Sequence, residues 1–147
     1  MTDINTLSDS DIIQILQNQN IHIHGIYMKD ELPNKLTKGF YIVNLQSSTD
    51  GNGTHWIALY YSPVCSYYFD AFGFIAPMEV QNKIIPYAYN DKQIQNLNSS
   101  ACGYYCIAFI IFLYGKKDIE NLYRIFINLF SNDTKRNDEV LERLLYK

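Results

Sequence analysis

The feature that most constrains this chain is an apolar block at residues 102–114, CGYYCIAFIIFLY. It follows the polar, turn-prone residues 95–101 and ends at Gly115, and these bounds predict a helix. A helix that is apolar on every side has to be buried. The block is too short and too rich in tyrosine to span a bilayer, so we expect no membrane association. The sequence therefore predicts a buried central helix.

The other segments supply a sheet and further helices. Runs rich in β-branched and aromatic residues predict strands, and Ser62-Pro63 predicts the turn between two of them. The expected strands are residues 40–45, 55–61, 66–70 and, briefly, 92–95. The expected helices besides the central one are residues 8–16, 77–84, 118–130 and 138–146. This order predicts one α+β domain spanning residues 1–147, with an antiparallel or mixed central sheet and helices segregated from it.

Charge and cysteine content exclude several classes of function. The net charge is −3, and no basic cluster exceeds the pairs Lys116-Lys117 and Lys135-Arg136, so no nucleic-acid footprint is expected. The first residues are acidic and polar, which predicts neither a signal peptide nor a transit peptide. Three cysteines, an odd number without a secretory signal, predict free thiols in a reducing compartment.

Two of the three histidines, His22 and His24, would share one face of an extended segment. Such a pair could bind a metal, but no carboxylate or cysteine lies at ligand spacing nearby. We therefore interpret both as partly exposed histidines and expect no metal site.

The third histidine, His55, opens a strand directly after the Gly-rich residues 46–54, which predict a loop. If Ser62-Pro63 lies at the tip of the hairpin, His55 faces Asp70 or a position next to it. Opposed side chains in such a ladder have Cβ atoms ~5 Å apart and diagonal ones ~7–8 Å. An aspartate at that distance can fix the tautomer of the imidazole and stabilise the imidazolium. The alternative is a pair with a purely structural role.

Cys102 stands where the central helix begins. Ser99 and Ser100 are expected N-cap residues, and a thiol at a helix N-terminus ionises more readily. Gly103 is expected to leave the backbone beside the thiol unobstructed, whereas Cys106, one turn later, is expected to pack in the core. The N–H groups of this helix start and the side-chain amide of Gln95 could stabilise an oxyanion. These residues predict acyl transfer to a thiol.

Trp56 follows His55 directly and admits two interpretations. It either walls a narrow substrate cleft or fills the core, and the residues alone leave both open.

Three segments resemble the adenovirus-type, or adenain-like, maturation cysteine proteases, which share a clan with the SUMO-specific proteases. They read GTHWIALYY, YYFDAFGF and QNLNSSACGYYC, and they occur in the family's order. The likeness covers about residues 8–115 and includes a Gly-x-Tyr loop at residues 25–27. It implies an adenain-like fold with the nucleophile at the N-terminus of the buried helix. It also implies that His55 is the general base, Asp70 its orienting acid, Cys102 the nucleophile and Gln95 the oxyanion-hole side chain.

The resemblance also implies what the protein acts on. Ser-Ala-Cys-Gly is similar to the viral branch of the clan, and the chain's size and composition point to a virophage or Polinton-type element. The implied activity is cleavage of viral capsid or core precursors at Gly-containing sites during virion maturation. The implied location is the virion and the virus factory in the host cytoplasm.

Two departures from the family change the expected partners. The chain is acidic, so activation by nucleic acid is not expected, and residues 75–99 contain no cysteine that could receive a disulfide-linked peptide. We therefore expect a monomer that needs no cofactor. Any activating peptide would bind without a disulfide.

Two other functions remain open at this point. One is a cysteine peptidase that removes a ubiquitin-like, SUMO-type modifier, which would require a folded substrate with a C-terminal Gly-Gly. The other is a non-catalytic binding module on the same scaffold, which the complete set of His, Asp, Gln and Cys argues against.

Overall fold

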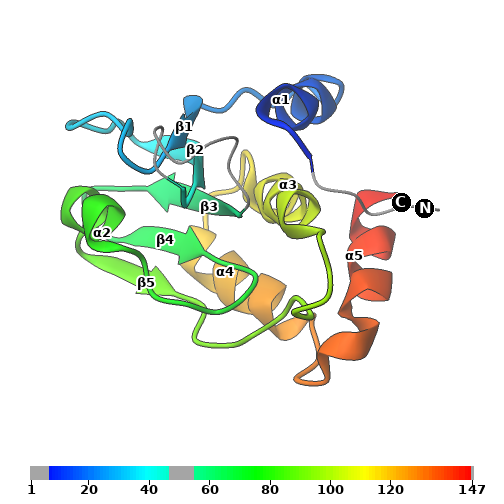
Figure 1. The fold of residues 1–147 in the computed structure, drawn as a ribbon. Coiled ribbons are helices and arrows are strands. Elements are labelled where there is room, and N and C mark those ends of the chain that lie inside the picture. The colour runs from blue at the N-terminus through cyan, green and yellow to red at the C-terminus, as the bar shows by residue number, and fades with distance from the viewer. Residues whose placement is uncertain (1–6, 47–54, 147) are drawn as a thin grey trace.

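The computed structural model of the protein describes residues 7–46 and 55–146. Its strands form one five-stranded sheet in which they follow chain order (Figure 1). The strands are β1 (Gly25–Met28), β2 (Gly39–Asn44), β3 (Trp56–Tyr61), β4 (Ser66–Phe69) and β5 (Tyr87–Tyr89). The helices are α1 (Asp9–Gln17), α2 (Met78–Ile84), α3 (Cys102–Leu113), α4 (Ile119–Asn128) and α5 (Asn137–Leu145), with a 3-10 turn η1 (Thr134–Arg136) before α5.

The sheet is mixed. The three central strands pair antiparallel, whereas β1 runs parallel to β2 and β5 runs parallel to β4. The predicted α+β class is therefore confirmed in its mixed form. In the β3–β4 hairpin, Ala58 pairs with Phe69, which is two residues from the predicted register. A shift of two residues keeps every side chain on its face of the sheet, so the predicted neighbours remain close.

Two hydrophobic clusters lie on opposite faces of the sheet. Phe40, Ile42, Trp56 and Ala58 pack toward α3 in one cluster, together with residues of α1, α4 and α5. The alternate residues of the same strands pack against Val80 and Ile84 of α2. Figure 1 shows α2 at one side of the sheet and α1, α3 and α5 at the other. Side chains alternate between the two faces along β2 and β3, so successive residues belong to the two different clusters.

The apolar block forms the predicted buried central helix. Nine of the twelve residues of α3 are buried, so this helix presents almost no face to solvent. Its Phe109 ring stacks on Phe69 of β4, with ring centroids 5.2 Å apart and an angle of 2° between the planes. Among the described residues, no helix is long and apolar enough to cross a membrane.

The other helices begin and end within two residues of their predicted bounds. The helix predicted at residues 8–16 is α1, and Ser8 caps it in a capping box with Asp11. The loop predicted at residues 46–54 falls outside the described ranges except at Gln46, which lies in a bend.

Two predictions at the edges of the sheet are wrong. The strand expected at residues 92–95 is irregular chain, because the N–H groups of Ile94 and Gln95 both donate to one loop carbonyl, that of Ala71, at 2.8 Å. The edge strand is β5, five residues earlier, where Tyr87 and Tyr89 flank an alanine. At the other edge, residues 25–27 form part of β1 instead of a loop, because they pair with β2.

Candidate active site

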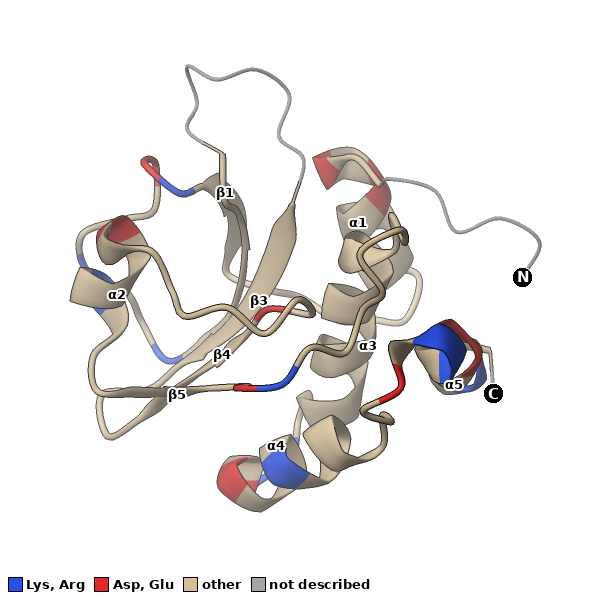
Figure 2. Ribbon diagram, turned by 60° about the horizontal axis from the view of Figure 1, so that its bottom comes forward, with Lys and Arg blue, Asp and Glu red and all other residues tan. Residues whose placement is uncertain are grey.

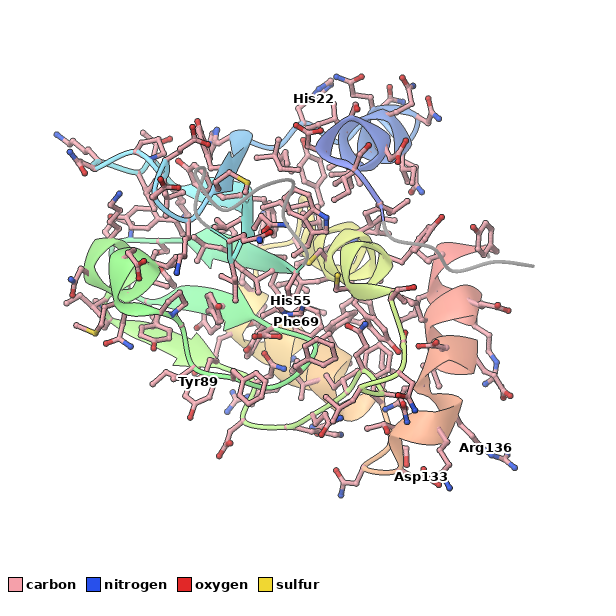
Figure 3. All side chains as sticks on the ribbon, viewed as in Figure 1. His22, His55, Phe69, Tyr89, Asp133 and Arg136 are labelled. Atoms are coloured by element: carbon pink, nitrogen blue, oxygen red, sulfur yellow. The ribbon has the colours of Figure 1, made fainter. Side chains whose placement is uncertain are left out.

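His55 and Asp70 lie at neighbouring ends of two paired strands. His55 directly precedes β3, and Asp70 directly follows β4. The side chains meet diagonally, and His55 Nε2 lies 2.7 Å from Asp70 Oδ1. The predicted contact is present although the register differs. Figure 3 shows His55 between the sheet and α3, whereas His22 lies far away beside α1.

Asp70 is held through Oδ1 and through its backbone, whereas Oδ2 is buried without a hydrogen-bond partner among the described residues. The side chain is fully buried, and Oδ1 also accepts the N–H of Phe72 at 2.8 Å. Asn90 clamps the backbone of Asp70: its Oδ1 accepts the Asp70 N–H at 3.0 Å, and its Nδ2 donates to the Asp70 carbonyl at 2.5 Å. Asn90 was not predicted as a site residue. Its role depends on the parallel pairing of β5 with β4, which the sequence did not indicate.

The surroundings of His55 favour its protonated form. Burial lowers the pKa of His55, but the hydrogen bond to Asp70 and the side chain of Cys102 outweigh burial and raise the pKa to about 9. The Phe72 ring stacks on the imidazole with centroids 4.6 Å apart, and an aromatic face attracts a cation. The second ring nitrogen, Nδ1, is buried and has no hydrogen-bond partner among the described residues. The contacts with Asp70, Cys102 and Phe72 thus favour the imidazolium over the neutral imidazole.

Cys102 is the first residue of α3 and is 4% exposed. The predicted serine cap is wrong: the N-cap is Ala101, which makes no side-chain hydrogen bond to the helix. Ser99 instead accepts the N–H of Ala101 at 3.2 Å, one residue before the helix, because its hydroxyl is directed toward Asp138. The residue at the N-cap thus contributes no side-chain bond to the end of α3 that favours negative charge.

Gln95 is fully buried in the loop between β5 and α3. Its N–H donates to the carbonyl of Ala71, the residue after Asp70, so the loop runs beside the His55–Asp70 pair. The Nε2 amide donates to the carbonyl of Ser99 at 2.8 Å, and Oε1 has no partner among the described residues. An amide nitrogen carries two hydrogens, and the bond to Ser99 uses one of them.

Trp56 and Gly103 both contact Leu7, and for Trp56 this favours the core-filling interpretation. Trp56 is 5% exposed in the core, and its indole N–H donates to the carbonyl of Leu7 at 2.9 Å. A Cβ placed on Gly103 would lie 3.2 Å from two carbons of the Leu7 side chain. Gly103 therefore makes room for Leu7. Trp56 anchors that same residue and does not line an open cleft.

The remaining candidates lie apart from this site. His24 is bonded through Nε2 to the carbonyl of Lys38 at 2.7 Å. No group of three His, Cys, Asp or Glu side chains in the described ranges could hold a metal ion. All three cysteines are free thiols, and burial raises the pKa of Cys106 well above its usual value.

Compared with known protein families and with curated proteins, the chain matches no family model and no curated protein. Function is therefore inferred from the geometry of these side chains.

Proposed function

We propose that the protein is an adenain-like cysteine endopeptidase in which Cys102 is the nucleophile. One observation supports this most directly: His55, bonded to Asp70, interacts with the thiol of Cys102 at the first residue of α3. A base, an orienting acid and a nucleophile in this relation suit acyl transfer.

Because His55 Nε2 is bonded to Asp70, the other ring nitrogen, Nδ1, carries out the proton transfers. With His55 protonated and Cys102 as thiolate, the sulfur attacks a peptide carbonyl and the carbonyl π electrons move to oxygen. The N–H of Cys102 and the second Nε2 hydrogen of Gln95 bind that oxyanion. As the intermediate collapses, Nδ1 gives its proton to the leaving amine and a thioester remains. Nδ1 then takes a proton from water, the hydroxide attacks the thioester, and the thiolate leaves.

We further propose that the substrates are viral capsid or core precursors, cut at Gly-containing sites during virion maturation in the virus factory and virion. Two features support this. Three segments resemble the viral maturation proteases in the family's order. Cys102 is also only 4% exposed, which suits a substrate with a thin main chain such as one at glycine.

The test is to incubate the purified protein with structural precursors from the same genome, beside Cys102→Ala. Cleavage should occur next to glycine and disappear in the variant. Cys65→Ser is the matched control, because Cys65 is a half-buried thiol in the β3–β4 turn, and it should cleave normally. Cleavage that survives in Cys102→Ala would contradict the proposal.

Two further arms separate the alternatives. A narrow approach to Cys102 also suits the Gly-Gly tail of a SUMO-type modifier. If the protein releases such a modifier but does not cleave the precursors, the deconjugating peptidase is favoured. Iodoacetamide at neutral pH should alkylate Cys102 first and abolish cleavage, because burial keeps Cys106 in its thiol form. An unreactive Cys102 would favour the binding module.

A further inference from the structure

The loop that carries Gln95 is held from the last helix of the structure. The first two residues of α5, Asn137 and Asp138, each bond to this loop. Asn137 is fully buried, and its Nδ2 donates to the carbonyl of Ile94 at 2.8 Å. Asp138 Oδ2 accepts the hydroxyl of Ser99 at 3.2 Å. One short segment of α5 therefore fixes the loop at two points.

Those two points lie on either side of Gln95. Ile94 directly precedes it, and the carbonyl of Ser99 accepts its side-chain amide at 2.8 Å. Ser99 also accepts the N–H of Ala101, the residue before Cys102, at 3.2 Å. The two donors that the proposed reaction uses for its oxyanion, the Gln95 amide and the Cys102 N–H, are thus both tied to Asp138 through Ser99.

Asp138 is itself fixed by the nucleophile helix. Tyr105, fully buried one turn into α3, donates its hydroxyl to Asp138 Oδ1 at 2.7 Å. Burial and the carboxylate raise the pKa of Tyr105 well above its usual value, so the hydroxyl keeps its proton and remains a donor. The carboxylate therefore joins α3, α5 and the Gln95 loop. Asn137 is fixed as well, because it exchanges bonds of 2.8 Å with both backbone groups of Ser131.

We propose that Asn137 and Asp138 are positioning residues for the peptidase reaction, acting through Ile94 and Ser99 on the oxyanion-binding groups. This inference rests on the proposed function. Asn137 is fully buried and the Asp138 carboxylate is bonded to Ser99 and Tyr105, so we expect the effect to fall on turnover more than on binding. A small displacement of a preorganised donor is enough to lower kcat.

The test is a double-mutant cycle on Asp138→Ala and Ser99→Ala, measured on a Gly-containing peptide that the wild-type protein cleaves. Each single variant should lower kcat by about tenfold, less than complete loss of an oxyanion donor, with KM changed by less than about twofold. Because both variants break the Ser99–Asp138 bond, the loss of kcat in the double variant should be smaller than the product of the two single losses. Asp138→Asn keeps an oxygen acceptor and should recover most of kcat.

Glu139→Ala is the matched control. Glu139 is exposed in the same first turn of α5, so its loss changes the helix-end charge equally without affecting Ser99. It should retain wild-type kcat. If Asp138→Ala does not fold, Ser99→Ala alone decides, and an unchanged kcat overturns the inference. Additive losses, or an equal loss in Glu139→Ala, overturn it too. A wild-type protein without Cys102-dependent cleavage overturns the proposed function and this inference with it.

Discussion

At the scale of single residues, the contacts of His55 favour its positive charge, which burial alone would disfavour. The imidazole is 17% exposed, yet its contacts raise the pKa from 6.5 to about 9. Asp70 supplies the largest compensating contact, and it is fully buried and bonded to two donors. The protonated histidine and its acid are therefore a single unit, and removing either leaves the other costly to bury.

This unit predicts how stability depends on pH. The folded protein binds the His55 proton more tightly than the unfolded chain, whose pKa is near 6.5. The resulting stabilisation is complete below pH 6.5 and is lost as pH rises through about 9. A rise of this size corresponds to about 3 kcal/mol. The free energy of unfolding by urea should fall over this interval in the wild type. The fall should be smaller in His55→Gln than in the wild type. In His22→Gln it should equal that of the wild type, because His22 is exposed. An equal fall in His55→Gln and wild type would contradict the assignment.

Asn90 predicts a second effect at this scale. Its side chain satisfies both backbone groups of the buried Asp70. Asn90→Ala should lower the free energy of unfolding by about 1–3 kcal/mol, because it leaves those groups buried without partners. It should also lower kcat by about tenfold or more through displacement of Asp70. Asn128→Ala, at an exposed position in α4, should change neither quantity, and equal effects in the two variants would exclude a specific role for Asn90.

The residues that sequence reasoning could identify are those whose role is local. His55, Asp70 and Cys102 each stand at the end of a predictable element, so their type and position indicate a site. Asn90, Asn137 and Asp138 act through contacts 20, 43 and 39 residues apart in the chain. No spacing in the sequence marks such contacts. Trp56 was ambiguous because its indole partner, the Leu7 carbonyl, lies 49 residues away.

At the scale of elements, the loop after β4 and the loop after β5 form one structural unit. Ala71 accepts two N–H groups from the second loop. Gly73 has a φ of +83°, and a Cβ at this position would lie 2.7 Å from the backbone carbonyl of Lys92. Close backbone contact of this kind admits only glycine. The site acid and Gln95 therefore belong to loops that cannot shift independently.

A comparison of Gly73 with Gly115 distinguishes the effect of this close contact from the effect of a left-handed backbone conformation. Gly115 has a φ of +73° with nothing within 4 Å of the added Cβ, so Gly115→Ala should cost about 1–2 kcal/mol for the left-handed conformation alone. Gly73→Ala carries the same strain and must also displace Lys92. It should cost at least about 1 kcal/mol more and lower kcat, whereas Gly115→Ala should not. Equal melting temperatures and equal rates in the two variants would contradict the packed-loop description.

The elements themselves were largely predictable because their signals are local. Ser8 and the periodic Ile12 and Leu16 define α1, and the apolar block defines α3. The short edge strands β1 and β5 were missed, since three or four residues carry no clear period and their pairing is decided by the neighbouring strand. The serine cap failed for a similar reason, because a distant carboxylate binds the Ser99 hydroxyl.

At the scale of the whole molecule, charge is dispersed. Figure 2 shows Lys and Arg on separate elements, mostly with acidic residues nearby. Lys29 pairs with Glu79 at 3.2 Å, and Lys92 donates to two carbonyls at the end of α4. The chain carries 12 basic and 15 acidic residues. No concentrated basic face results among the described residues.

Duplex DNA should therefore leave the peptidase rate unchanged within about twofold, because binding to a polyanion requires several lysines and arginines acting together. At about 0.15 M salt the Debye length is about 8 Å, so isolated cations contribute little. The measurement is hydrolysis of a Gly-containing peptide during a DNA titration, with an uncharged polymer as the control. A saturable rise of tenfold or more would disprove this expectation.

The bonds by which Asn137 and Asp138 hold the Gln95 loop have a consequence for biosynthesis. A ribosome makes the chain from the N-terminus, so His55, Asp70, Gln95 and Cys102 all emerge before α5. The hydrogen-bond partner of Ser99 is then synthesised 39 residues later, and that of Ile94 is synthesised 43 residues later. If Asn137 and Asp138 position the oxyanion groups, a nascent chain carries its nucleophile but not a finished reaction centre. Proteolysis would then begin only after translation of α5, and the nascent chain would not cleave nearby proteins during its synthesis.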